Sequence, residues 1–281
     1  MSIAPLDRRI TISSKPEHLA DIKRLSDLAD EPYVVLLGEP GLGKTEAFKH
    51  FAAACGLQCE EACLLDPTDL ASDGTYFIDA IDEISIDEAR GIAQSLRRAK
   101  GCRWRVSCRA EDWNSGGALS KAFGSGLAAA GVEPVVAQLQ PLDEEEAIAV
   151  LTAIGHQSPP TVISTLQALN SPPFVMTPLG LRFLMTVKPE QLSEITRYQL
   201  YTSGTTHLAQ EHNEARAELA TAPSRHTILD TAGRIFLTLL TTGKHGVQRS
   251  GMGSSNTLDL AEIGLDSALV QCGALLYLAH P

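Results

Sequence analysis

The amino-acid sequence predicts an α/β protein in which a parallel sheet flanked by helices is followed by a mostly helical region. Two observations favour this fold class. Short apolar strands alternate with helical segments as far as Pro141, and the strand at residues 33–37 runs directly into a glycine-rich loop and a further helix. After Pro141 the segments keep a helical composition and are separated by Pro, Ser and Thr residues.

The elements of the sheet region follow from apolar periodicity and from breaks at Gly and Pro. Tyr33–Leu37 is a short apolar run with two adjacent valines, which is typical of a strand buried on both faces. Residues 112–131 are small and glycine-rich and are expected to hold helical patches. Helices are predicted at residues 16–30, 43–56 and 85–101, and strands at residues 9–13, 33–37, 58–66, 75–83, 103–109 and 133–142.

The region after Pro141 is predicted to begin with a helix, because Asp143 and Glu146 have the spacing of a capping box. This spacing explains the acidic run "DEEE" as a helix start and not as a metal site. Further along, two helices are expected within residues 157–187 and one at residues 227–244, then a loop at residues 250–257 and one or two short helices at residues 260–279.

Composition and charge exclude several classes of protein. The chain has 281 residues, a net charge of -11 and a pI of about 5.2, so no broad electrostatic footprint for nucleic acid is expected. A local basic patch around residues 96–105 stays open. The amino terminus is polar, unlike a signal peptide, and the apolar run at residues 268–279 is too short to span a membrane. We therefore expect a cytoplasmic protein that has no membrane partner.

The cysteines are predicted to be free, buried thiols in a reducing compartment, since six of them in a chain of this length form no disulfide framework. Cys55, Cys59 and Cys63 are spaced four apart, which raises the possibility of a metal site. Cys63, however, lies in a predicted strand, and no fourth ligand has the spacing that a zinc site needs.

The sequence "GEPGLGKT" at residues 38–45 fits the phosphate-loop spacing G-x-x-x-x-G-K-[ST]. A polyphosphate needs several inward-pointing backbone N–H groups, and glycines let the backbone come close to it. Lys44 is expected to reach the β- and γ-phosphates of ATP, and the Thr45 hydroxyl to ligate Mg²⁺. Nucleotide binding is thus predicted at Gly38, Glu39, Pro40, Gly41, Leu42, Gly43, Lys44 and Thr45.

The segment "YFIDAIDE" supplies the acids that hydrolysis would need, namely a metal-holding carboxylate and a group that orients water. Asp79 ends an apolar run and is the expected Mg²⁺ ligand, while Asp82 or Glu83 is expected to polarise the attacking water. Arg109 ends another predicted strand and is expected to sense the γ-phosphate. The carboxyl ends of parallel strands meet at one edge of a sheet, so these side chains are expected to converge with Lys44.

On these residues the chain resembles the NACHT-type branch of the STAND NTPases, which are signalling ATPases related to AAA+ proteins. "GEPGLGKT" resembles their Walker A motif, and "FIDAIDE" resembles their Walker B motif, in which the aspartate, here Asp79, is followed by a small residue and then by a D-E pair, here Asp82 and Glu83. "RVSCR" resembles their sensor strand. "TPLGLRFL" resembles the proline motif of their lid, and its proline, here Pro178, lies near the nucleotide base in the family.

The resemblance covers about residues 33–185 and implies an ATP-driven signalling switch that hydrolyses slowly and assembles into a homo-oligomer on activation, for instance in bacterial defence against phage. It implies an NTPase core at residues 1–139, a helical lid at 140–190 and a winged-helix-like unit at 191–281. A separate effector or sensor protein, or a missing C-terminal domain, is then an expected partner. The alternatives are an AAA+-like motor or loader acting on DNA or protein, which the acidic charge disfavours for DNA, and a scaffold that binds nucleotide without hydrolysing it.

Overall fold

The structure is a computed structural model that divides into two compact units, Met1–Leu181 and Arg182–Pro281. The predicted division at residues 139 and 190 stays a prediction. The residues that the structure describes are 6–13, 24–39, 41–68, 70, 73–99, 101–114, 117–128, 132–168, 175–184, 194, 196–208, 224–244, 246–248 and 257–259.

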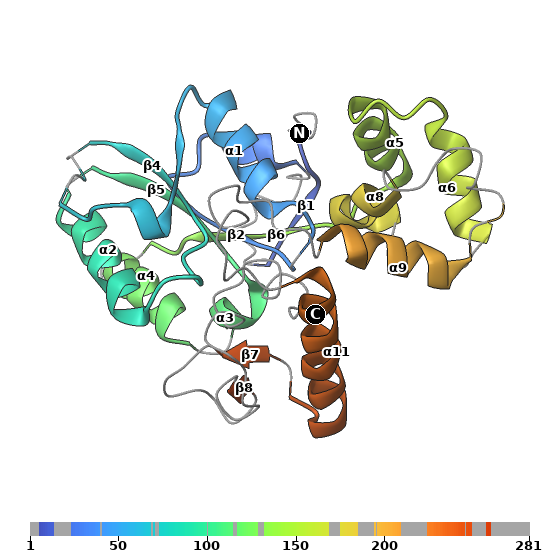
Figure 1. Ribbon diagram of the computed structural model, residues 1–281. Coiled ribbons are helices and arrows are strands. Elements are labelled where there is room, and N and C mark those ends of the chain that lie inside the picture. The colour runs from blue at the N-terminus through green and yellow to red at the C-terminus, as the bar shows by residue number, and fades with distance from the viewer. Residues whose placement is uncertain are drawn as a thin grey trace. The chain divides into compact units, whose positions relative to one another are not determined.

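The first unit is built on a six-stranded sheet with the strand order β1-β6-β2-β5-β4-β3 (Figure 1). All neighbouring strands are parallel except β1 and β6, which are antiparallel. The predicted α/β fold class is therefore confirmed, with one antiparallel strand at the edge of the sheet. The strands are β1 (Ile10–Ile12), β2 (Tyr33–Leu37), β3 (Cys59–Glu61), β4 (Thr75–Asp79), β5 (Arg103–Cys108) and β6 (Val135–Leu139).

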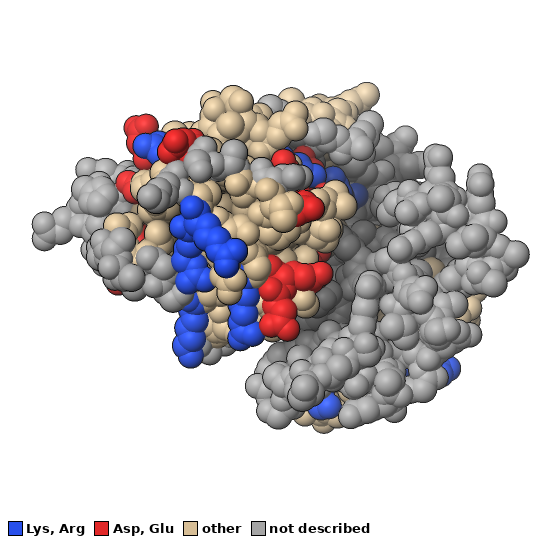
Figure 2. Space-filling view, turned by 90° about the vertical axis from the view of Figure 1, so that its left-hand side faces the viewer, with Lys and Arg blue, Asp and Glu red and all other residues tan. Residues whose placement is uncertain are grey.

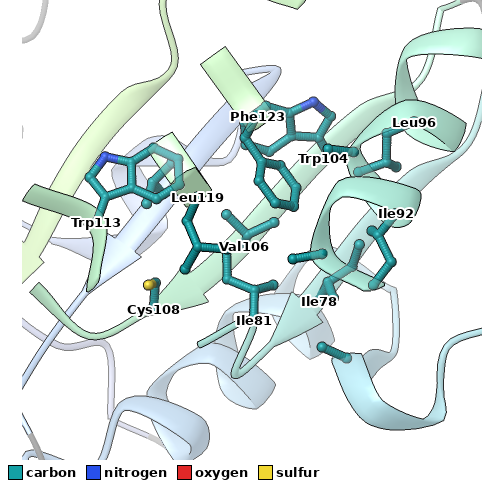
Figure 3. Close-up of a cluster of buried hydrophobic side chains, with 14 of the residues drawn as sticks. Ile78, Ile81, Ile92, Leu96, Trp104, Val106, Cys108, Trp113, Leu119 and Phe123 are labelled. Carbon is teal, nitrogen blue, oxygen red and sulfur yellow. The ribbon is translucent and has the colours of Figure 1, made fainter. Parts of the chain in front are cut away.

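Helices cover both faces of this sheet. Side chains on a strand alternate between its two faces, and the central strands carry apolar residues on both, so each face has to be buried. Val34 and Leu36 of β2 belong to the hydrophobic cluster under α1 (Lys44–Ala54), and Val35 belongs to the cluster under α2 (Ile86–Arg98) and α4 (Ala118–Ala128). Figure 3 shows the second cluster, in which Trp104 and Val106 of β5 lie beside Phe123 of α4. Both hydrophobic clusters bury β2, so the loop that follows it is attached to a strand packed on both faces.

Basic side chains gather on the side of the first unit where α2, β4 and β5 lie (Figures 1 and 2). Within the basic segment predicted at residues 96–105, Arg97, Arg98 and Arg103 are exposed. Arg103 begins β5, and Arg97 and Arg98 lie in the last turn of α2. These three arginines therefore belong to the amino end of the strands, opposite to the end at which the candidate site lies.

Three helices follow the sheet within or at the end of the first unit, namely α5 (Glu144–Ala153), α6 (Pro159–Ala168) and α8 (Pro178–Leu184). The predicted capping box at the start of α5 is confirmed. Asp143 Oδ1 accepts a hydrogen bond from Glu146 N at 2.8 Å, and Glu146 Oε2 accepts one from Asp143 N at 3.1 Å. The acidic run is thus a helix start, as expected.

The second unit contains α9 (Arg197–Leu208), α11 (Arg225–Thr242) and two short parallel strands, β7 (Gly246–Gln248) and β8 (Thr257–Asp259). The predicted helix at residues 227–244 is confirmed, and the strands were not predicted. The helices expected at residues 260–279 lie outside the described residues. Among the described residues, no helix is long and apolar enough to cross a membrane.

Two predicted elements differ from the structure near the edges of the sheet. The helix predicted at residues 16–30 is a 3-10 helix, η2 (Leu25–Leu28), in its described part, because Arg24 forms a β-bridge with Arg9 just before it. The strand predicted at residues 58–66 ends at Glu61 and is followed by a second 3-10 helix, η3 (Ala62–Leu64). Cys63 lies in η3 and is exposed, so both its predicted place in a strand and its predicted burial were wrong.

The helical patches predicted within residues 112–131 are confirmed in the described part of this stretch. It contains most of a short helix, α3 (Ala110–Asn114), and the eleven-residue helix α4. Leu119, Phe123 and Leu127 recur every fourth position of α4 and are all buried. This apolar stripe packs against the sheet and α2, and it overrides the weak helix propensity of the glycines.

Candidate nucleotide-binding site

The predicted phosphate loop connects β2 to α1 at the carboxyl end of the sheet. Gly38 N donates a hydrogen bond to Cys108 O at 3.3 Å, which extends the pairing of β2 with β5 by one step. Gly41 and Gly43 have φ values of 80° and 77°, a left-handed conformation that side chains other than glycine disfavour. Pro40 lies outside the described residues.

The start of α8 lies directly against this loop. A Cβ atom added to Gly41 would stand 3.1 Å from Leu179 Cδ2, and one added to Gly43 would stand 3.0 Å from Pro178 Cγ. Leu179 N also donates a hydrogen bond to Gly41 O at 3.4 Å. The structure therefore places Pro178 beside the phosphate loop, whereas its contact with a nucleotide base stays a prediction.

Lys44 and Thr45 open α1 at the end of the loop. Lys44 Nζ donates a hydrogen bond to Gly38 O at 3.2 Å, so the ammonium group lies across the loop. This is the loop that is predicted to hold the phosphates that Lys44 contacts. Helix α1 begins at Lys44, and Ala47 N donates to Gly43 O at 3.0 Å as its first turn closes. Glu39 is exposed, while Leu42 is buried beneath the loop.

Asp79 ends β4 and is 1% exposed, and a residue that sequence reasoning missed holds it in place. Ser107 of β5 donates a hydrogen bond from its hydroxyl to Asp79 Oδ1, and its Oγ accepts one from Ala80 N at 2.9 Å. Because β5 lies between β2 and β4, Ser107 stands between the phosphate-loop strand and the acidic strand. The sequence signal that could have pointed to this role is a serine between Val106 and Cys108, two residues that are buried in this strand.

The chain turns sharply after Asp79 and does not continue as the predicted strand to residue 83. Ala80 has a φ of 58°, which is a left-handed conformation unusual for alanine. Ile81 N then donates to Ser107 O at 3.1 Å, and Glu83 N donates to Ala80 O at 3.0 Å. This turn directs Asp82 and Glu83 back toward the end of β5.

Asp82 and Glu83 meet Arg109, the residue directly after β5. Asp82 Oδ2 lies 3.0 Å from Arg109 Nε, and Glu83 Oε1 lies 3.9 Å from Arg109 Nη2. The Asp82 side chain is only 2% exposed, and its Oδ1 atom is buried without a hydrogen-bond partner among the described residues. The Glu83 side chain is 65% exposed, and partial desolvation of its carboxyl together with the neighbouring Asp82 charge raises its pKa, a shift that Arg109 partly opposes.

The few oxygen ligands available here suit Mg²⁺, which completes its coordination shell with water and phosphate oxygens, better than a metal ion that needs three or more protein ligands. Among the described residues, no three His, Cys, Asp or Glu side chains are grouped closely enough to hold a metal ion. Mg²⁺ takes one or two protein oxygens and completes its shell with waters and phosphate oxygens. The Thr45 hydroxyl and the Asp79 carboxylate, both at the carboxyl end of the sheet, fit that requirement.

Comparisons with known proteins add little to this geometry. No protein-family model matches the chain, and no curated protein matches it. Among solved structures, the chain is similar to RuvB, a Holliday junction branch migration motor of Thermotoga maritima, with 14% identity over 88% of this chain and 79% of that chain and a TM-score of 0.37. An alanine-to-serine mutant of the same RuvB has 13% identity, the same coverage and a TM-score of 0.37. At these TM-scores the likeness carries no argument about this chain.

The α/β architecture described above agrees with the fold class that the sequence predicts. A mostly parallel sheet is flanked by helices, and a glycine-rich phosphate loop joins one of its buried central strands to a helix. Acidic residues and an arginine stand at the same edge of the sheet as that loop, at the ends of the next two strands.

Proposed function

We propose that this protein binds ATP with Mg²⁺, hydrolyses it slowly and acts as a cytoplasmic signalling switch of the NACHT and STAND type. One observation carries the proposal. The phosphate loop, Asp79, the Asp82–Glu83 pair and Arg109 all lie at or just after the carboxyl ends of three adjacent strands, β2, β5 and β4. This edge of a doubly wound sheet is where such folds bind ligands.

Nucleotide binding would rest on the loop backbone and on Lys44. The left-handed glycines would let backbone N–H groups turn toward one anion, and the start of α1 would add its own N–H groups and the positive end of its dipole. Lys44 would exchange its bond to Gly38 O for phosphate oxygens. Thr45 and Asp79 would hold Mg²⁺, which when bound neutralises charge on the β- and γ-phosphates.

Glu83 is the residue that we assign to orient and deprotonate the attacking water. Asp82 is the other candidate from the sequence, but its Oδ2 is engaged by Arg109 at 3.0 Å. Glu83, by contrast, is 65% exposed, so water can reach its carboxylate, and its pKa is raised in the direction that favours a general base.

Arg109 would be the element that distinguishes ATP from ADP. In this structure its guanidinium pairs with Asp82, and a γ-phosphate would compete with Asp82 for the same group. A ligand shifts an equilibrium between two conformations only by its differential affinity for them, and this contact exists only with ATP. The resemblance to NACHT-type proteins suggests that the ATP-bound form assembles into a homo-oligomer, with phage defence as one setting.

The test compares the dissociation constants of ATP and ADP in the wild type, in Arg109→Ala and in Arg90→Ala. Arg90 is a matched control, since it is an exposed arginine that pairs with Asp87 on α2. We expect Arg109→Ala to bring the ATP and ADP affinities closer together, and Arg90→Ala to leave both unchanged.

A double variant, Asp82→Asn with Arg109→Ala, removes the buried charge that Arg109→Ala alone would leave unpaired, so it guards against loss of the fold. Protease sensitivity at residues 140–190 gives a second readout of the two nucleotide states. A wild type that does not distinguish ATP from ADP by either measure would contradict the switch and favour a nucleotide-binding scaffold.

A further inference from the structure

Arg8, near the amino terminus, is buried against the phosphate loop although it lies far from the loop in sequence. Its side chain is 3% exposed. Nη1 donates a hydrogen bond to Leu42 O at 2.7 Å, and Nη2 donates one to Gln140 O at 2.7 Å. Nε lies 3.9 Å from Glu146 Oε1 and has no hydrogen-bond partner among the described residues. Three separate contacts therefore hold this guanidinium in one place.

The carbonyl that Arg8 contacts shares a peptide unit with a predicted phosphate ligand. Leu42 C=O and Gly43 N–H belong to the same planar group, and in a trans peptide they point in opposite directions. A guanidinium that holds the carbonyl on one side therefore fixes the direction of the N–H on the other. Among the described residues, Gly43 N–H donates to no protein acceptor, which leaves it available to an anion.

The contact also strengthens that donor. A charged group that donates to a carbonyl polarises the whole peptide, which makes the N–H at its other end a better hydrogen-bond donor. Gly43 lies close to the arginine, since a Cβ atom added there would stand 3.5 Å from Arg8 Nη1. Gly43 itself has no side chain that could restrain its peptide, so an outside group has to do so.

We propose that Arg8 is a positioning residue for nucleotide binding, which orients and polarises the Leu42–Gly43 peptide so that Gly43 N–H points at the polyphosphate. The proposal rests on the proposed ATP-binding function and adds to it a residue outside the phosphate-loop motif. Arg8 acts through the peptide and does not touch the phosphates.

A purely structural role for Arg8, as a staple between the amino terminus and the sheet, is the competing explanation, and Arg105 supplies the matched control. Arg105 is also buried, at 2% exposure, and donates from Nη2 to Ala29 O at 2.6 Å and to Glu31 O at 2.9 Å. Its guanidinium stacks against Phe51 and Phe77, and none of these four partners belongs to the phosphate loop. Arg105→Met should thus weaken folding without a specific effect on phosphate binding.

The test measures the affinities of Mg-ATP and of Mg-tripolyphosphate by calorimetry in the full chain carrying Arg8→Met, Arg8→Lys or Arg105→Met. Tripolyphosphate isolates the phosphate cradle from any contact with the base. We expect Arg8→Met to weaken the affinity for both ligands about tenfold. A hydrogen bond from Gly43 N–H to a charged phosphate is worth about that much, and the variant would lose most of it. Arg8→Lys keeps the charge, but a single ammonium group cannot reach both Leu42 O and Gln140 O as the two guanidinium nitrogens do. We therefore expect about a threefold loss of affinity.

Folding stability is measured in parallel by urea unfolding. The proposal is overturned if Arg8→Met binds both ligands like the wild type, or if Arg105→Met loses as much affinity as Arg8→Met does. If Arg8→Met does not fold, wild-type affinity in Arg8→Lys overturns it instead. A wild type that binds no ATP contradicts the proposed function itself, and is thus distinguishable from a failure of Arg8 alone.

Discussion

Removal of the Arg109 guanidinium should destabilise the protein more than the exposure of that residue suggests, because it leaves a buried carboxylate without its partner. Arg109 is 28% exposed, but the Asp82 side chain that it pairs with is only 2% exposed. The second Asp82 oxygen, Oδ1, is already buried without a hydrogen bond among the described residues. Water therefore cannot replace the lost guanidinium easily.

The expected cost follows from these two exposures. Breaking a fully buried ion pair by removing one partner costs about 3–5 kcal/mol, and the partial exposure of Arg109 reduces this to about 2 kcal/mol for Arg109→Met. Asp82→Asn removes the charge that needs a partner, so the double variant should be more stable than Arg109→Met alone. We expect a coupling energy of about 1–2 kcal/mol between the two positions.

Urea unfolding followed by tryptophan fluorescence gives the four stabilities of this cycle, since Trp104 and Trp113 are both buried in the first unit. The Asp87–Arg90 pair of α2 is the control. It has a similar distance of 2.9 Å but side-chain exposures of 85% and 52%, so it should show almost no coupling. If the Asp82–Arg109 coupling energy is no larger than that of the control pair, this buried ion pair does not stabilise the fold more than a surface pair does.

Two further substitutions test the acidic side of the site. Glu83→Gln should bind ATP normally but hydrolyse it about a hundredfold more slowly or worse. The rate of the wild type should fall as the pH drops through the raised pKa of Glu83, above the ordinary value of 4.5, because only the carboxylate accepts a proton, and Glu83→Gln should lose this dependence. Wild-type turnover in single-turnover assays would refute the assignment of Glu83. Ser107→Ala should destabilise the fold by about 2 kcal/mol, because it leaves Asp79 and Ala80 N–H without their buried partner. Ser120→Ala is its control in the same urea assay, because it removes a hydroxyl of α4 that donates to Gly117 O just before that helix, and equal losses would contradict a special role for Ser107.

Local sequence patterns were sufficient for most of the sheet. An apolar run followed by a glycine-rich loop placed β2 and the start of α1 correctly, and a capping box placed the start of α5. Each of these signals depends on residues a few positions apart. The end of β4 was predicted too late, because Ile81 continues the apolar pattern while Ala80 turns the backbone into the left-handed region. Such a turn has no signature in a run of apolar residues.

Contacts between distant residues could not be predicted. The order that inserts β5 between β2 and β4 places Ser107 against Asp79, 28 positions away in sequence. Arg8 reaches Leu42 across 34 positions, and no motif marks it. The pairing of Arg109 with Asp82 could not be predicted either, since strand order places the two only at the same edge of the sheet. Placement at an edge follows from topology, whereas the partner of each side chain depends on packing.

Calorimetric titration of the wild type and of Lys44→Ala with Mg-ATP tests the central claim most directly. Lys44 supplies the only Lys or Arg charge within residues 38–45, and its ammonium group already lies across the loop, bonded to Gly38 O. The wild type should bind one ATP per chain, and Lys44→Ala should show no measurable binding at the same concentrations. Unchanged affinity in Lys44→Ala, or a wild type that binds no nucleotide, would contradict the assignment of this loop as a phosphate-binding site.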